Sequence, residues 1–178
     1  MKKKFTIENE PITSIVESPA AVYTLAASSN PFLNLVRSIF LLLGIPNESS
    51  AHPPIKNNAD FIDIIRDGIP RKSIDHLMEN TGLTVAEISN IIRTSDRTLR
   101  RYTAKQKLNP EQTERILELA RLYSRGEEVF GQMEKFKSWM NNPVMALGNK
   151  KPKEFLDTSI GIELLINELG RIEHGIFA

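Results

Sequence analysis

The chain has 178 residues, enough for one or two small domains, and its 40% hydrophobic and 25% charged residues are ordinary for a soluble globular protein. Cysteine is absent, which excludes disulfide scaffolds, thiolate zinc sites and a cysteine nucleophile, and fits a reducing compartment. The net charge of +1 points to no class of partner, so only the distribution of charge along the chain is informative.

No segment predicts secretion or membrane insertion. Glu8, Glu10 and Pro11 follow the basic N-terminus, where a signal peptide would have its apolar core. The best apolar run, 32–45, contains Arg37, and its uninterrupted part is far shorter than the ~20 residues of a membrane span. We therefore expect a soluble, cytoplasmic protein that does not bind membranes.

Composition separates the chain into three regions. Residues 1–58 are poor in charge and rich in Pro, Ser and Asn, residues 59–125 contain a series of short helical patterns, and residues 126–178 are more apolar. Strand-like alternation of polar and apolar residues is nearly absent, so the predicted fold is mainly α.

The first region predicts one helix. Asn30-Pro31 is typical of a helix start, apolar residues recur at three- and four-residue steps through 31–43, and Gly44 ends the pattern. A single helix cannot bury an apolar face alone, so this one must pack on the rest of the chain or on a second copy. Residues 47–58 read as a linker.

The second region predicts five helices, over 61–66, 70–80, 84–92, 96–103 and 110–124. Thr84 and Glu87 form a capping-box pattern at the start of the third. Ser95 can cap the fourth, and Asn109 precedes a proline and an acidic residue at the start of the fifth.

The helices predicted over 84–92 and 96–103 are short and joined by a turn of about three residues, which is the arrangement of a helix-turn-helix. Ile88, Ile91 and Leu99 supply an apolar seam between them. The second helix of such a pair can enter the major groove of DNA.

Basic residues gather around that second helix. Residues 93–107 hold six basic residues against one acidic residue, a net charge of +5 on a chain whose total is +1. Such a segment is the electrostatic footprint of a phosphate binder. The candidates for base edges near the helix start are Asp96, Arg97, Thr98 and Arg101, with Arg100 beside them. The candidates for phosphate contacts are Arg93, Lys105 and Lys107.

Other interpretations of this basic segment are a solvated face on an ordinary helical bundle and a surface for an acidic protein. Catalysis is not indicated: His52, His76 and His174 lack metal-ligand spacing, and the common phosphate-loop, zinc-protease and nucleophile-elbow motifs do not occur. We expect no enzyme activity, no metal and no cofactor.

The third region predicts a helix over 127–140, a short helix near Pro152 and an amphipathic helix marked by apolar residues from Ile162 to Ile172. The last residues leave two alternatives open. One is a helical subdomain with a frayed terminus. The other is an apolar terminal peptide, Ile176-Phe177, that docks in a cleft of a partner.

Several motifs, taken in order, resemble a single family. They are Arg97 to Arg101, Phe130, Trp139, Pro143, Ala146 to Gly148, Pro152, Phe155 to Thr158 and Gly170 to Gly175. Over residues 74–178 they resemble the Xre/MbcA/ParS family of antitoxins. Met140 and Asn149 depart mildly from the family pattern, which usually has Leu and Gly at these places.

This resemblance implies an antitoxin of a type II toxin–antitoxin system, with a Xre-like helix-turn-helix bundle over 59–125 and a small helical toxin-binding domain over 126–178. The implied partners are operator DNA and a RES-domain toxin, which resembles ADP-ribosyltransferases and consumes NAD. The antitoxin would block the cleft of the toxin and repress its own operon.

The resemblance also implies roles for particular residues. Arg97, Arg100 and Arg101 would bind DNA. The toxin-binding domain would be built mainly by Trp139, Pro143, Leu147, Pro152, Leu156 and Gly161. Arg171, Glu173, His174 and Gly175 would lie at or beside the blocked cleft. A further hypothesis is that Gly175 lets the chain turn out of its last helix, so that Ile176, Phe177 and the carboxylate of Ala178 enter that cleft.

The alternative to an antitoxin is a stand-alone dimeric transcription regulator whose C-terminal region mediates only self-association. A third interpretation is a structural adaptor with an unused helix-turn-helix. We expect a homodimer in the first two cases, because helix-turn-helix proteins read two half-sites and because the helix over 31–43 has an apolar face to cover.

Overall fold

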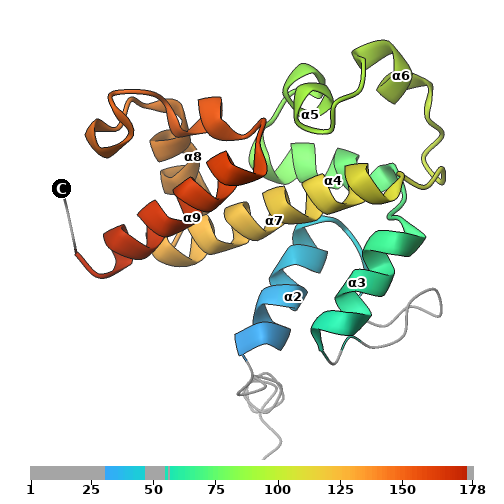
Figure 1. The fold of residues 1–178 in the computed structure, drawn as a ribbon, viewed down its shortest axis with the longest axis horizontal. Helices are drawn as coiled ribbons and strands as arrows, with labels where there is room; N and C mark the ends of the chain where they lie inside the picture. Colours follow the sequence, from blue (N-terminus) through green and yellow to red (C-terminus); the bar gives the residue numbers. More distant parts are fainter. Residues whose placement is uncertain (1–30, 47–54, 56, 176–178) are drawn as a thin grey trace, which may run out of the picture.

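The computed structural model describes residues 31–46, 55 and 57–175, and within them the chain is built from helices without a β-sheet (Figure 1). The mainly α fold is thereby confirmed. The helices are α2 (Pro31–Leu42), α3 (Asn58–Asp67), α4 (Lys72–Thr81), α5 (Val85–Ile91), α6 (Asp96–Arg101), α7 (Pro110–Phe130), α8 (Met133–Asn141) and α9 (Ser159–Glu173). Two short 3₁₀ turns, η1 (Met145–Leu147) and η2 (Pro152–Phe155), lie between α8 and α9. No helix in the described ranges is long and apolar enough to span a membrane.

Side-chain caps fix where several of these helices begin, as the sequence predicts. The hydroxyl of Thr84 accepts a hydrogen bond from the backbone N–H of Glu87, whose carboxylate accepts one in return from the Thr84 N–H. Ser95 caps α6 by accepting from the N–H of Thr98. Asn109 caps α7, with Pro110 as the first helical residue. Each cap satisfies backbone donors that a helix start leaves without partners.

Helix α7 is the central element, and helices from both ends of the chain pack on it. It contacts α2, α3 and α4 as well as α8 and α9, and in Figure 1 α2 and α3 lie below it. Its apolar side chains Ile116, Leu119 and Leu122 are fully buried. One continuous core therefore extends from α2 to α9.

The predicted break between helices 110–124 and 127–140 is wrong. Helix α7 continues through Gly126 to Phe130, and the chain turns only at Gly131, which has a φ of +71°. The reason is steric: a Cβ at Gly126 would lie 2.4 Å from the ring of Phe136, so this glycine makes room for an aromatic ring rather than ending the helix. The division of the chain at 125/126 stays a prediction, and α7 crosses it.

Helix α2 is covered by the chain itself. Its buried side chains Val36, Ile39 and Phe40 face the common core, and α2 packs on α7. The prediction of a helix over 31–43 is confirmed. Of the two covers expected for its apolar face, the structure supplies the intramolecular one. Most of the predicted linker 47–58 lies outside the described residues.

Aromatic packing joins α7 to α8. The Phe136 ring is fully buried and meets the Tyr123 ring edge-on, with centroids 5.2 Å apart. Phe130 and Trp139 lie against the same ring, each with its centroid 5.9 Å or less away. Such pairs add to the free energy of burial, and they fix the angle at which α8 leaves α7.

Substituting Gly126 with Ala should lower the free energy of unfolding, although alanine favours helices. Overpacking against the Phe136 ring costs about 1–3 kcal/mol, more than the ~1 kcal/mol gained in helix propensity. Gly170 in α9 is the matched control, because a Cβ there meets no atom within 4 Å. Gly170→Ala should therefore stabilise. Urea denaturation of both variants decides this, and equal stabilisation by both would contradict the packing argument.

Candidate functional site

The turn between α5 and α6 has a defined geometry that places basic residues at the surface. The N–H of Arg93 donates to the carbonyl of Asn90 at 3.2 Å, and the N–H of Thr94 donates to that of Ser89 at 2.9 Å. Arg93 thus occupies the left-handed position that follows a helix, with a φ of +53°. Glycine is the usual residue there, because a Cβ in this conformation costs about 1–2 kcal/mol.

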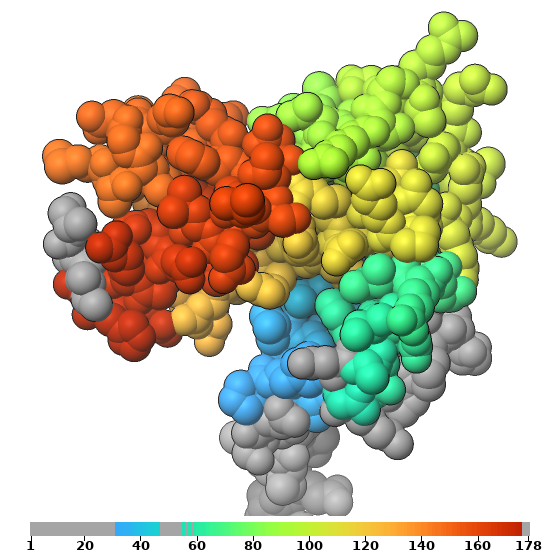
Figure 2. All heavy atoms as spheres, viewed as in Figure 1, coloured from blue at the N-terminus to red at the C-terminus, as the bar shows by residue number. Residues whose placement is uncertain are grey.

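The seam of the helix-turn-helix is buried as expected. Ile88 and Leu99 are fully buried and Ile91 nearly so. Among the described elements α6 packs chiefly on α5, so its outer side is free. In the space-filling view the segment around α6 projects at one corner, on the opposite side from α8 and α9 (Figure 2).

All six basic residues of the segment 93–107 are exposed, and in Figure 2 this segment lies along the upper right of the molecule. Two of them are paired: Lys107 lies 2.5 Å from Asp67, and Arg93 lies 3.8 Å from Glu111. The other four have no carboxylate within ion-pair distance among residues 31–46, 55 and 57–175: they are Arg97, Arg100, Arg101 and Lys105. Unpaired cations on a convex corner are suited to binding an extended polyanion.

The remaining two candidates for base contacts are placed differently. Asp96 is exposed in the first turn of α6, where its negative charge interacts favourably with the helix dipole. The hydroxyl of Thr98 lies 2.8 Å from that of Ser95 and takes part in the cap of α6. The Thr98 hydroxyl therefore helps to cap this helix, although the side chain is exposed.

The second group of candidate residues lies at the other end of α7. Leu147 is buried, Trp139 is half-buried among the aromatic rings of α7 and α8, and Pro143 is exposed. Leu147 and Trp139 therefore contribute mainly to the packing of this region. Of these three residues, only Pro143 is freely accessible to a partner.

The end of α9 brings the other predicted contact residues together. Arg171 pairs with Glu168 at 3.4 Å, and Glu173 pairs with Arg125 of α7. His174 and Gly175 are exposed, and Gly175 has a φ of +67°, which fits the predicted turn out of the helix. Ile176, Phe177 and Ala178 lie outside the described residues.

Two polar contacts between distant parts of the chain could not be predicted from the sequence. Arg115 of α7 is only 6% exposed, and its guanidinium donates to the carbonyls of Ile91 and Leu156 and to the hydroxyl of Ser159. Lys153 donates to Glu87 at 3.3 Å. The partners are 24 or more positions apart, so no local spacing indicates them. One sequence feature could have indicated that Arg115 is buried: it shares a helix face with apolar, buried positions four and seven residues later.

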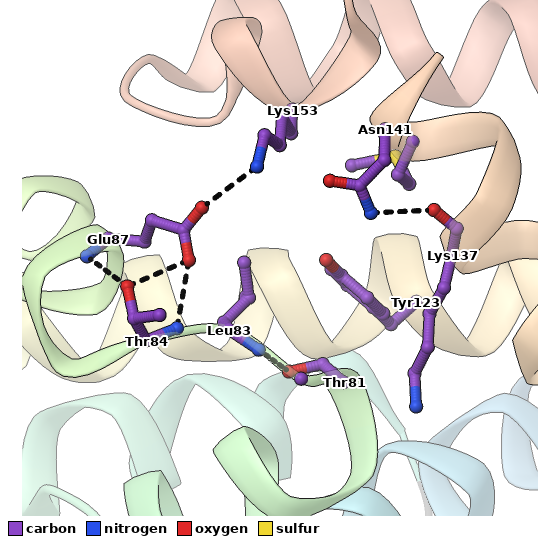
Figure 3. Close-up of a pocket in the computed structure, with 10 residues that line it drawn as sticks. Thr81, Leu83, Thr84, Glu87, Tyr123, Lys137, Asn141 and Lys153 are labelled. Atoms are coloured by element: carbon purple, nitrogen blue, oxygen red, sulfur yellow. Dashed lines mark hydrogen bonds and ion pairs between the residues drawn. The ribbon is translucent and has the colours of Figure 1, made fainter.

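A cavity of about 170 Å³ lies beside the second contact, lined by ten residues that include Thr84, Tyr123 and Lys153 (Figure 3). Burial raises the pKa of Tyr123, so its phenol is neutral at physiological pH. Within the described ranges no group of three His, Cys, Asp or Glu side chains could hold a metal ion.

Comparison with known proteins agrees with this arrangement. Residues 60–121 match the antitoxin Xre-like helix-turn-helix domain, and residues 125–175 match the antitoxin Xre/MbcA/ParS C-terminal toxin-binding domain. Antitoxin Xre of Yersinia enterocolitica is 30% identical over 127 residues, which are 70% of this chain and 86% of that protein. Antitoxin Xre of Photorhabdus laumondii is 30% identical over 136 residues, 75% of this chain and 86% of that protein.

Two further matches are more distant. The Prs ADP-ribosylating antitoxin of Sphingobium sp. is 26% identical over 129 residues, which cover 67% of this chain and 81% of that protein. The crystal structure of the M. tuberculosis MbcT–MbcA toxin–antitoxin complex contains a chain that is 20% identical, with a TM-score of 0.43, covering 70% of this chain and all of that one. On the domain matches and the two Xre relatives, the chain belongs to the Xre antitoxin family, with a Xre-like helix-turn-helix domain followed by the toxin-binding domain of these antitoxins.

Proposed function

We propose that this antitoxin neutralises a RES-domain toxin, an NAD-consuming protein that resembles ADP-ribosyltransferases, by blocking its active-site cleft. It also represses its own operon by binding operator DNA through α6. In this proposal the protein is not an enzyme and acts in the cytoplasm, where operator and toxin are both present. The relative named an ADP-ribosylating antitoxin supports this class of toxin.

The unpaired cations of α6 and its flank are the observation that carries the DNA-binding half. A protein that neutralises phosphates releases their bound counterions, and this favours binding at low salt. Arg97, Arg100, Arg101 and Lys105 can do so without breaking an ion pair within the described chain. Lys107 and Arg93 would exchange an exposed carboxylate for a phosphate, which costs little because surface pairs are weak.

A homodimer on the operator is part of the proposal, because two recognition helices about 34 Å apart fit successive major grooves. The face of α2 that is buried against α7 is not free to form its interface. The dimer therefore needs another surface or is completed within the toxin complex.

The toxin-binding half rests on the match of residues 125–175 to the toxin-binding domain and on the geometry at the end of α9. Gly175 lies in a left-handed turn directly after α9, and the next two residues are Ile176 and Phe177. These side chains would bury in the cleft of the toxin, at about 1.5–3 kcal/mol for each. The domain match favours this function over a stand-alone regulator.

Replacing both Arg97 and Arg101 with Ala should weaken operator binding and flatten its dependence on salt. A lost base contact should cost ~1–3 kcal/mol at one base position, and lost phosphate contacts should lower the salt slope. Fluorescence anisotropy with the duplex upstream of the gene, measured across salt, reports both. The control is Arg66→Ala with Arg121→Ala, which removes the same charge from α3 and α7. Unchanged binding by the α6 variant at every salt concentration would place the recognition site elsewhere.

Arg93→Gly separates stability from binding. Glycine relieves the left-handed strain but loses entropy on folding, so the free energy of unfolding should stay the same or rise by up to ~1 kcal/mol. Operator affinity should fall, because a phosphate contact is lost. Asn149→Gly is the control, since Asn149 is the other non-glycine residue with positive φ in the described ranges, and it lies outside the basic segment. Wild-type operator affinity for Arg93→Gly would exclude this phosphate contact.

Deleting residues 174–178 should abolish neutralisation while leaving operator binding intact. If Ile176 and Phe177 each bury fully, their loss should weaken toxin binding by about 10²-fold or more. NAD consumption by the toxin in the mixture and toxin affinity are the measurements, and Phe177→Ala serves as a milder variant. A truncated chain that neutralises as well as the full chain would refute entry of the tail into the cleft.

A further inference from the structure

Helix α5 is held at both of its ends by polar groups that come from outside the helix-turn-helix. At its first turn Lys153 reaches Glu87, and at its last turn Arg115 reaches the carbonyl of Ile91. Lys153 belongs to the region that matches the toxin-binding domain, and Arg115 joins α5 to the same region through Leu156 and Ser159. We call the contacts Lys153–Glu87 and Arg115–Ile91 together the clamp.

The contact at the first turn adds a cation to a capping box that Thr84 and Glu87 already complete. The Glu87 carboxylate accepts hydrogen bonds at 2.8 Å from both the N–H and the hydroxyl of Thr84, and its second oxygen lies 3.3 Å from Nζ of Lys153 (Figure 3). Partial burial opposes the charge on Glu87, but the hydrogen bonds from Thr84 and the ammonium of Lys153 outweigh it and lower the pKa of Glu87. The ionised carboxylate therefore holds two parts of the chain at once.

The contact at the last turn is a buried cation at the negative end of a helix. Nε of Arg115 lies 3.3 Å from the carbonyl of Ile91, one of the carbonyls that a helix end leaves without a partner. Its Nη1 lies 2.7 Å from the hydroxyl of Ser159 and 2.8 Å from Glu118, and its Nη2 lies 3.2 Å from the carbonyl of Leu156. A planar guanidinium can serve three directions together, which an ammonium group cannot do.

The position of α6 depends on that of α5. Among the described elements α6 packs chiefly on α5, and the turn between them begins one residue after Ile91. A displacement of α5 would therefore carry Arg93 and the whole recognition helix with it. Misplaced cations lose contacts to phosphates that lie at fixed positions along DNA.

We propose that the clamp positions the recognition helix, so that residues 153–159 of the toxin-binding region set the affinity for operator DNA. Glu87, Arg115, Lys153, Leu156 and Ser159 act as positioning residues and do not touch the DNA. This inference rests on the proposed operator binding, and it adds that the helix-turn-helix needs the C-terminal region for full affinity.

Lys153→Met is the main test, because Lys153 is at the surface and its loss leaves the core intact. Operator affinity should fall about twofold to fivefold, the range that a partly exposed ion pair allows. Lys151→Met removes the same charge from the exposed residue two positions earlier, and none of the hydrogen bonds and ion pairs resolved in the structure joins its ammonium to α5. It should bind the operator like the wild type. Lys153→Arg retains a cation for Glu87 and should restore affinity.

Arg115→Lys tests the other end of α5. The ammonium cannot reach Ile91, Leu156 and Ser159 together, so operator affinity should fall more than for Lys153→Met. Arg121→Met is the stability control, because Arg121 joins α7 to α9 through Glu163 at 3.1 Å and does not contact α5. Urea denaturation gives the folded fraction of each variant, and affinities are compared at a temperature where all of them are folded.

Amide hydrogen exchange distinguishes positioning from overall stability and needs no DNA. In the full-length chain, Lys153→Met should speed exchange over 92–101 and leave exchange in α7 and α9 unchanged. Equal losses of affinity for Lys151→Met and Lys153→Met, or unchanged affinity and exchange for Lys153→Met, would overturn the clamp. If the wild type binds no operator, the proposed DNA function fails, and the exchange data still decide whether the clamp restrains α6.

Discussion

The burial of α7 by helices from both ends of the chain is the constraint on which the rest of the structure depends. Its apolar residues leave the protein with one core rather than two, so the helix-turn-helix and the C-terminal region share a single folded unit. A helix of 21 residues is about 30 Å long, which sets the distance between α6 and the end of α9. Figure 1 places these elements at opposite ends of α7. The surfaces proposed here for operator and toxin therefore lie at different ends of the molecule.

Charge is distributed to suit this separation. The segment 93–107 has a net charge of +5 on a chain of +1, so the remainder of the molecule is acidic overall. Arginines elsewhere in α7 pair with acidic side chains, as Arg121 does with Glu163 and Arg125 with Glu128. Around α6, by contrast, four of the six cations have no carboxylate partner among the described residues. This contrast, rather than the number of arginines, distinguishes a binding surface from an ordinary solvated helix.

Structural features set by neighbouring residues, such as helix starts, could be predicted from the sequence, and contacts between distant residues could not. Thr84, Ser95 and Asn109 start their helices as their cap patterns predict, because a cap involves only neighbouring residues. The break predicted between 124 and 127 was wrong, because Gly126 lies inside α7 and makes room for the Phe136 ring, and that contact is tertiary. Arg115 was missed for the same reason: nothing within a few positions reveals that its partners are Ile91, Leu156 and Ser159. The exposed basic segment 93–107 could be found from the sequence, while the contacts of Arg115 that hold α5 in place could not.

If the clamp positions α6, binding of toxin and binding of operator can influence each other. A ligand changes the affinity for a second ligand only if it binds two states of the protein with different strength. Lys153 lies in η2, Leu156 follows it and Ser159 begins α9, all within the region that matches the toxin-binding domain. A toxin that favours the clamped state would raise operator affinity, and by linkage the operator would raise toxin affinity by the same factor. A toxin indifferent to the clamp would leave operator affinity unchanged, however tightly it binds. In this proposal, the two polar contacts at the ends of α5 are where coupling between neutralisation and repression acts.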